Sequence, residues 1–185
     1  MALAEEIRLT VEDYLAMPEG GPRYQLVEGE LIPMAPAPNR RHQRTSANLF
    51  SKLDQHVRGS RCGTLYFAPF DVVFDDFNVL QPDLIYISKA RSSILTDAGA
   101  TGAPDLVVEI LSPSTAKLDL HRKRAIYARH GVDEMWVVDP EAEEVRVYRF
   151  AERPDRPVVI HYKGDHFSSR HFPGLEILVD SLFED

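Results

Sequence analysis

Gln81-Pro82-Asp83-Leu84-Ile85-Tyr86-Ile87 is the first of two segments that decide the fold predicted from this sequence, and the second is Pro104-Asp105-Leu106-Val107-Val108-Glu109-Ile110-Leu111. Each is a run of β-branched, aromatic and leucine residues that opens at a proline and is bounded by turn-forming residues. That pattern is typical of a β-strand. Each predicted strand also carries a carboxylate, Asp83 in the first and Glu109 in the second.

The two carboxylates come together if the strands pair antiparallel. A register that sets Asp83 opposite Glu109 also sets Ile85 opposite Val107, with all four side chains on one face. The carboxylates would then lie within about 5 Å of each other at Cβ. Like charges that close need a cation or a proton between them, and a divalent metal suits oxygen ligands. The pair therefore predicts a metal site.

Composition limits the other possibilities. The chain has 185 residues, of which 44% are hydrophobic and 27% charged, enough for one substantial core but not for two domains. We expect a single domain over residues 1–185. The sequence has no apolar run of about 18 residues, and its start is acidic where a secretory signal would be basic and then apolar. We therefore expect a cytoplasmic protein without a membrane partner. The lone Cys62 cannot form an internal disulfide, and no function is assigned to it.

Charge bears on nucleic-acid binding in two ways. The net charge of -8 argues against a protein that coats nucleic acid nonspecifically, because that affinity comes from many Lys and Arg contacts. Basic residues nevertheless gather in two runs, at positions 40–44 and 117–130, near the carboxylate strands. Either run can also be a solvated helix face, and the sequence leaves both interpretations open.

The remaining pattern predicts alternating helices and strands. Thr10 and Asp13 fit the N-terminal capping spacing of a short helix that ends near Met17. A hairpin of residues 24–27 and 31–34 follows, then a proline-rich link at 35–38 and a long helix over 39–57. Strands are expected at 64–67, 70–74 and 134–138, a helix over 119–131, and a C-terminal hairpin of 145–150 and 158–163. Residues 88–102 are expected to form an irregular, mobile loop beside the site.

Two further side chains are predicted to point inward from helices. His42 begins the apolar stripe of the long helix, which continues through Leu49 and Leu53. Lys123 shares a stripe with Tyr127, and a buried ammonium needs a carboxylate partner. His42 can equally be a packed structural histidine, and Lys123 can extend to water or form only a structural ion pair with Glu109.

These residues together resemble a known family. The matching segments are 24–31, 38–43, Gln81-Pro82-Asp83, 109–115, Lys123 with Tyr127, 131–140 and 172–175. In order and spacing they are similar to the Uma2 family, which is assigned to the PD-(D/E)xK, or restriction-endonuclease-like, superfamily. The resemblance implies an α/β (α+β) fold: a mixed, curved β-sheet flanked by helices, with N-terminal and C-terminal hairpins.

The resemblance also implies a site. Asp83 and Glu109 would each bind Mg²⁺ or Mn²⁺, and the backbone carbonyl of Ile110 would complete the ligand set. The superfamily pattern calls for lysine where this chain has Leu111, so Lys123 on the following helix would take its place.

Two second-tier candidates are His42 and Glu28. Superfamily members often add an acidic residue from an early element, although a solvated turn carboxylate is the alternative for Glu28. Asp119 is expected to cap its helix, and Asp105 to open its strand at the end away from the site.

Two functions follow from these expectations. The first is a metal-dependent endonuclease that hydrolyses phosphodiester bonds in DNA, with Lys123 orienting the attacking water or stabilising the transition state. The second is a catalytically inactive nucleic-acid or protein-binding module that keeps the nuclease fold. Cleavage of both strands by one site per chain usually needs two copies, so a homodimer is expected.

Overall fold

The computed structural model describes residues 8–18, 20–34 and 39–184. The proline-rich link at 35–38 and the acidic start of the chain at 1–7 lie outside the described residues. The N-terminal elements are α1 (Val11–Leu15), β1 (Tyr24–Val27), β2 (Glu30–Pro33) and α2 (Arg40–Ser60). The central elements are β3 (Gly63–Phe67), β4 (Asp71–Asp75), β5 (Asn78–Leu80), β6 (Leu84–Ser88), η1 (Lys89–Ile94), β7 (Leu95–Thr96), β8 (Gly99–Thr101) and β9 (Leu106–Ile110). The C-terminal elements are η2 (Leu118–Lys123), α3 (Arg124–His130), β10 (Glu134–Asp139), β11 (Glu144–Arg149), β12 (Val159–His161), β13 (His166–Phe167), β14 (Ile177–Leu178) and η3 (Val179–Leu182).

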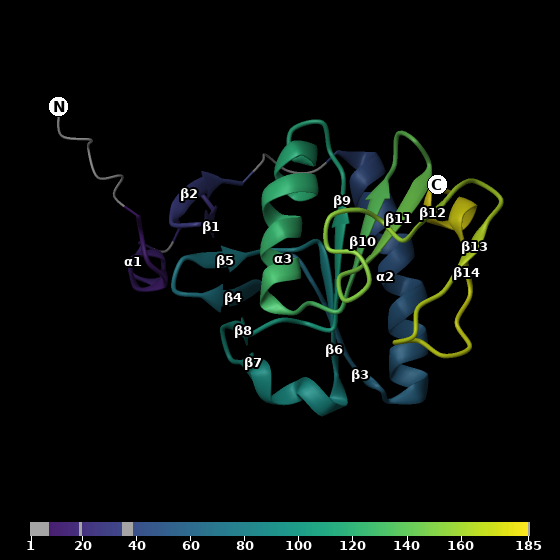
Figure 1. Ribbon diagram of the computed structural model, residues 1–185, viewed down its shortest axis with the longest axis horizontal. Coiled ribbons are helices and arrows are strands. Elements are labelled where there is room, and N and C mark those ends of the chain that lie inside the picture. The colour runs from purple at the N-terminus through teal and green to yellow at the C-terminus, as the bar shows by residue number, and fades with distance from the viewer. Residues whose placement is uncertain (1–7, 19, 35–38, 185) are drawn as a thin grey trace.

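The strands form two six-stranded mixed sheets and one two-stranded ribbon. The central sheet has the order β12-β11-β10-β9-β6-β3, and the N-terminal sheet has the order β2-β1-β5-β4-β8-β7 (Figure 1). The α/β class expected from the sequence is confirmed, but its strands belong to two main sheets rather than one. They divide because β4 and β5 pair with each other and, through β1, with the N-terminal hairpin.

The predicted pairing of the two decisive strands is confirmed where the ladder is regular. β6 and β9 run antiparallel with Ile85 opposite Val107. Both strands are shorter than predicted, because β6 begins after Asp83 and β9 begins after Asp105. β9 and β10 run parallel and are joined by the helical segment η2–α3, as predicted for a βαβ unit. Gly131, in the left-handed conformation at φ 81°, ends α3.

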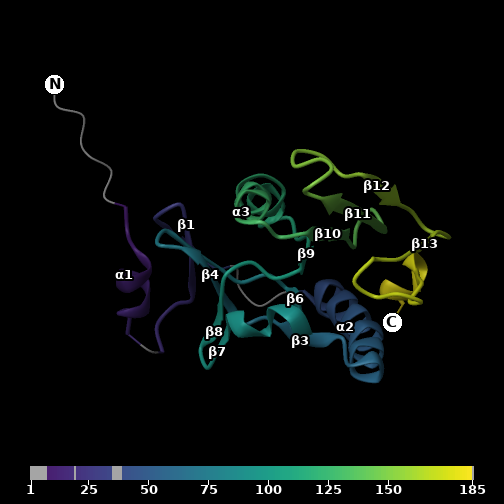
Figure 2. The same ribbon diagram turned by 60° about the horizontal axis from the view of Figure 1, so that its bottom comes forward.

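The side chains of β6 and β9 alternate between two cores, one on each face of the central sheet. Tyr86 and Val108 pack in the core that includes residues of α2, whereas Ile85 and Val107 pack in the core that includes residues of α3. Figure 2 shows α2 and α3 on opposite sides of these strands. The strands are buried on both faces, which explains why they read as continuous apolar runs in the sequence.

Helix α2 is fixed at its start and along its buried side. The side chain of Asn39 caps the first turn by accepting a hydrogen bond from the backbone N–H of His42, 2.9 Å away. Leu49 and Leu53 are completely buried, and each contributes about 1.5–3 kcal/mol by its burial. The first turn of α2 is therefore held at one end of the central sheet.

Residues 88–102 do not form the irregular loop predicted from the sequence. They contain the 3₁₀-helix η1 and the strands β7 and β8, and β8 pairs in parallel with β4. This segment follows the end of β6 opposite to Asp83, so it does not border the predicted site as a loop. The prediction was wrong because local composition does not show the long-range strand pairings that order this segment.

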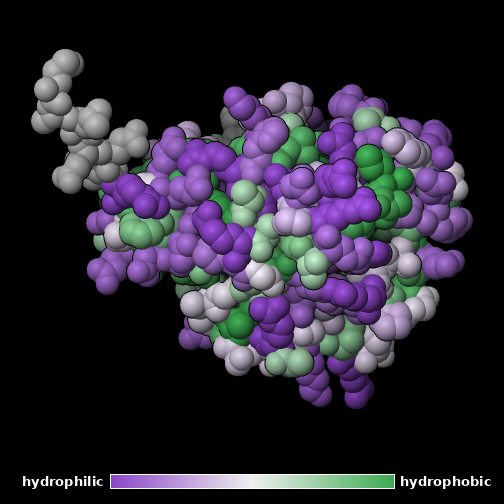
Figure 3. All heavy atoms as spheres, viewed as in Figure 1, coloured by the Kyte–Doolittle hydropathy of each residue, from purple (hydrophilic) through white to green (hydrophobic). Residues whose placement is uncertain are grey.

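The surface over α3 is polar. In Figure 3 this face is mostly hydrophilic, and its hydrophobic residues lie in small separate groups. Of the helices in the described part of the chain, none combines the length and apolar composition that a membrane span needs.

Candidate active site

Asp83 lies between β5 and β6, at the end of the central sheet. Its Oδ2 accepts a hydrogen bond of 2.7 Å from the backbone N–H of Ile110, and its backbone carbonyl accepts one of 3.0 Å from the N–H of Ala68. The side chain thus takes a backbone donor that strand pairing would otherwise use. Its second oxygen, Oδ1, remains available to other groups.

His42 faces that second oxygen from the first turn of α2. Its Nε2 lies 3.3 Å from Asp83 Oδ1. Burial lowers the pKa of His42, but the hydrogen bond and charge of Asp83, together with the Ile110 carbonyl, outweigh burial and raise the pKa above its ordinary value. His42 is therefore biased toward the imidazolium form, which pairs with the carboxylate.

Glu109 and Lys123 form a second, more deeply buried group on the α3 side of the sheet. Lys123 Nζ lies 3.1 Å from both Glu109 carboxylate oxygens and 3.0 Å from Asp119 Oδ1. The Tyr127 hydroxyl donates a hydrogen bond to Glu109 Oε1. Side-chain exposures are 2% for Glu109, 4% for Lys123 and 3% for Asp119, so these charges interact away from bulk water.

The charges of this group are unequal, because one ammonium faces several carboxylates. Burial raises the pKa of Glu109 to about 8, and Asp119 and Asp83 add to the rise although Lys123 and Tyr127 oppose it. Burial lowers the pKa of Lys123, but the three carboxylates more than offset this and hold it above its usual range.

The structure places five of the predicted residues in two groups and leaves Glu28 apart. Asp83 contacts His42 and the backbone of Ile110, and Glu109 contacts Lys123. By contrast, Glu28 sits in the turn between β1 and β2, where its carboxylate pairs with arginines of the η2–α3 segment. The partners are Arg122 at 3.3 Å and Arg129 at 3.8 Å.

Sequence reasoning misjudged Asp119, which does not cap a helix. It lies inside η2, a π-helix, with its carboxylate directed at Lys123. Asp119, Lys123 and Tyr127 are spaced four residues apart on one helical segment, and that spacing is the signal that could have placed Asp119 on the inner face. Asp105, as expected, lies at the far end of β9, where it accepts a hydrogen bond of 2.6 Å from the Ser88 N–H.

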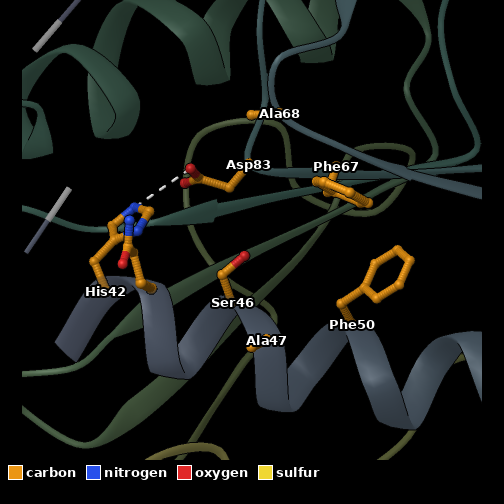
Figure 4. A pocket seen from close by; sticks show the side chains of 8 residues that line it. His42, Ser46, Ala47, Phe50, Phe67, Ala68 and Asp83 are labelled. Carbon is orange, nitrogen blue, oxygen red and sulfur yellow. Dashed lines mark ion pairs between the residues drawn. The ribbon is translucent and has the colours of Figure 1, made fainter. Parts of the chain in front are cut away.

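A cavity of about 410 Å³ opens next to Asp83. Its polar end has His42 and Asp83, and its apolar end has Phe50 and Phe67, with Ser46 between the two ends (Figure 4). The two phenylalanine rings pack edge to face, 5.0 Å apart at their centroids. The cavity therefore offers one charged and one aromatic contact region.

Comparison with protein families identifies the chain. A family model named Uma2, described as "Putative restriction endonuclease", matches residues 11–180. The chain belongs to the Uma2 family. The family resemblance drawn from the sequence motifs is thus confirmed.

A solved structure agrees with this assignment at the level of the fold. The Uma2 chain is similar to a crystal structure described as "a putative nuclease belonging to DUF820" from Anabaena variabilis, with a TM-score of 0.79 and 22% sequence identity. The similarity covers 95% of this chain and 97% of that one. The comparison with curated proteins found no match.

The described residues limit how a metal could be held. Within residues 8–18, 20–34 and 39–184, no three or more His, Cys, Asp or Glu side chains form a group arranged to hold a metal ion. The two predicted ligand carboxylates instead have protein partners, Ile110 and His42 for Asp83 and Lys123 for Glu109. Many of the basic residues near the site are also paired, as with Arg41, 2.8 Å from Glu141, and Arg122, 2.7 Å from Glu30.

Proposed function

We propose that this Uma2 chain is a Mg²⁺- or Mn²⁺-dependent endonuclease that hydrolyses phosphodiester bonds in DNA, with residues 1–185 acting as one restriction-endonuclease-like domain. The observation that carries the proposal is the contact of Lys123 Nζ with both carboxylate oxygens of Glu109. Glu109 lies on β9, which pairs with β6, the strand that begins directly after Asp83. An acid-acid-lysine set at one end of a mixed sheet matches the chemistry that the family name implies.

The donor atoms fit a hard divalent cation. Asp83 and Glu109 supply carboxylate oxygens, and Ile110, which follows Glu109, supplies a backbone carbonyl; oxygen ligands of these kinds suit Mg²⁺ and Mn²⁺. When bound, such an ion supplies Lewis-acid polarisation of the phosphodiester and neutralises its developing charge. Glu109 would hold such an ion as its carboxylate, because a metal ligand must be deprotonated.

The other residues prepare this arrangement. Tyr127 and Asp119 hold Glu109 and Lys123 respectively, so the ammonium is fixed before substrate arrives. From that position Lys123 orients the attacking water or stabilises charge in the transition state. His42 holds Asp83 from the opposite face and adds positive charge at the mouth of the site. Glu28, paired with Arg122, is given no role in this proposal.

The closing test is Mn²⁺-dependent cleavage of supercoiled plasmid and of single-stranded DNA. We expect Asp83→Asn, Glu109→Gln and Lys123→Met to abolish cleavage while retaining native circular dichroism. The matched control is Asp97→Asn, which removes an exposed carboxylate in the turn between β7 and β8 and should cleave normally. Cleavage that survives the loss of both site carboxylates would refute the proposal.

A second candidate function is a catalytically inactive nucleic-acid or protein-binding module. It is favoured by the deep burial of Glu109, whose carboxylate already has Lys123 as a positively charged partner. Tight, salt-sensitive DNA binding by the native protein, without cleavage in Mg²⁺ or Mn²⁺, would support it over the nuclease.

The proposed enzyme acts as a homodimer, since one site per chain cuts one strand at a time. Sedimentation in the micromolar range measures this directly. Monomeric behaviour at that concentration would contradict it.

A further inference from the structure

The cavity beside Asp83 has a polar end and an aromatic end, which suits a whole nucleotide better than a phosphate alone. Figure 4 shows Asp83 and His42 at one end, Phe50 and Phe67 at the other, and the Ser46 side chain between them. His42 and Phe50 are eight residues apart on α2, which places the two ends about 12 Å apart along the helix axis. A volume of about 410 Å³ lies within the range of small-molecule sites.

Phe67 is an unusual residue for the surface. The residue is 58% exposed, and it is one of only three large hydrophobic residues so exposed in the described part of the chain. The ring packs against Phe50 in an edge-to-face contact, and the exposed residue lines the cavity. An exposed aromatic face at the rim of a cavity is a stacking platform, because every nucleobase has a π-face that can pack on it.

The position of Phe67 relative to Asp83 is fixed by strand pairing. Phe67 ends β3 and lies opposite Leu84, the residue directly after Asp83. The next residue, Ala68, donates its N–H to the Asp83 carbonyl at 3.0 Å. A base stacked on Phe67 would therefore be held at a set distance from the carboxylate that the proposed nuclease uses.

The polar end of the cavity suits the phosphate of the same nucleotide. The N-terminus of α2, a helix of 21 residues, lies at this end and adds the positive end of its dipole to His42. The negative charge of Asp83 at this end is paired with His42, whose Nε2 lies 3.3 Å from Asp83 Oδ1.

We propose that this cavity binds one unpaired nucleobase of the DNA substrate, stacked on Phe67, with the adjoining phosphate beside His42 at the N-terminal end of α2. This inference rests on the proposed nuclease function. A base within a continuous duplex keeps its π-faces covered by its neighbours, so it cannot reach the ring. The substrate class is therefore DNA with an unpaired nucleotide: single-stranded, bulged or flipped out of the helix.

Binding in EDTA tests the cavity separately from catalysis. Three fluorescent DNA duplexes would be compared by anisotropy: one fully paired, one with a single unpaired thymidine, and one with an unpaired abasic residue at the same place. The thymidine duplex should bind about tenfold more tightly than the abasic one, as expected for one base–aromatic stack. Phe67→Ala should remove that ratio, and Phe67→Tyr should retain it.

The control is Tyr162→Ala, which removes another exposed aromatic, 54% exposed, that does not line the cavity. It should leave the ratio unchanged, and circular dichroism should show that each variant is folded. Equal binding of thymidine and abasic duplexes by the native protein would overturn the proposal, as would a ratio that persists in Phe67→Ala or no binding to any of the three. If the native protein prefers the thymidine duplex but shows no Mn²⁺-dependent cleavage, only the proposed nuclease activity would be refuted.

Discussion

Replacing Glu109 with Gln should change how the stability of the protein depends on pH. The carboxyl of Glu109 is 2% exposed, and burial raises its pKa from 4.5 to about 8 in the folded protein. In the unfolded chain the group is solvated and loses its proton near its ordinary pKa. Glutamine has nearly the same shape as a protonated glutamate but does not titrate, so Glu109→Gln isolates the contribution of that proton.

The sign and size follow from proton linkage. A carboxyl group with a raised folded pKa stabilises the fold fully below the unfolded pKa, and that stability is lost as pH rises toward the folded pKa. For each pH unit in this window, the unfolding free energy of the native protein falls by roughly 1 kcal/mol relative to that of Glu109→Gln. From pH 5 to pH 8 the unfolding free energy of Glu109→Gln should therefore rise by roughly 3–4 kcal/mol relative to that of the native protein. This is equivalent to about 6–16 °C in melting temperature.

The assay is urea unfolding of both proteins at pH 5, 6, 7 and 8, followed by circular dichroism. Glu176→Gln, at an exposed position, serves as the control for losing a carboxylate as such. A difference in unfolding free energy between Glu109→Gln and the native protein that stays constant from pH 5 to pH 8 would refute the reasoning. It would mean that Lys123 keeps Glu109 ionised in the folded state.

Three further outcomes are expected. Because a metal ligand must be deprotonated, Mn²⁺ affinity measured by calorimetry should rise from pH 6 to pH 8 as Glu109 loses its proton, and a flat profile would argue against Glu109 as a ligand. Tyr127→Phe removes the hydroxyl that donates to Glu109 and should cost about 1–3 kcal/mol in urea unfolding; an unchanged midpoint would contradict that role. Gly63→Ala should lower the melting temperature strongly, because its Cβ would lie 2.3 Å from the Ile87 carbonyl oxygen. Gly59→Ala, whose Cβ meets nothing within 4 Å in α2, should instead raise stability by about 0.5–1 kcal/mol, so equal effects of the two changes would be the contrary result.

Much of the fold was predictable because the deciding signals are local or rest on strict periodicity. The Thr10–Asp13 capping box begins α1 as expected, and the hairpin of β1 and β2 turns at Gly29, where φ is 84°. Alternation along β6 and β9 allowed the pairing of Ile85 with Val107 to be predicted, since a shift by one residue would turn every side chain to the other face.

Other features depended on contacts between distant segments. The sequence does not show that the Asp83 carboxylate will accept a hydrogen bond from the Ile110 N–H, or that β6 will begin only after Asp83. It also does not show that β8 will pair with β4, because residues 88–102 have no strong periodicity of their own. Tertiary packing decided both, since backbone groups are satisfied by whichever partner the fold brings near.

For the candidate site, the sequence by itself determined the chemical groups: a carboxylate on β9, another directly before β6, a lysine on the next helical segment and a histidine on α2. Only the tertiary structure decided which partner each of these groups contacts. It buried Asp119 beside Lys123, turned Glu28 toward Arg122, and opened a cavity between His42 and Phe67. The physical reason is that residue spacing fixes which face of an element a side chain occupies, whereas burial, charge balance and cavities arise only where separate elements meet.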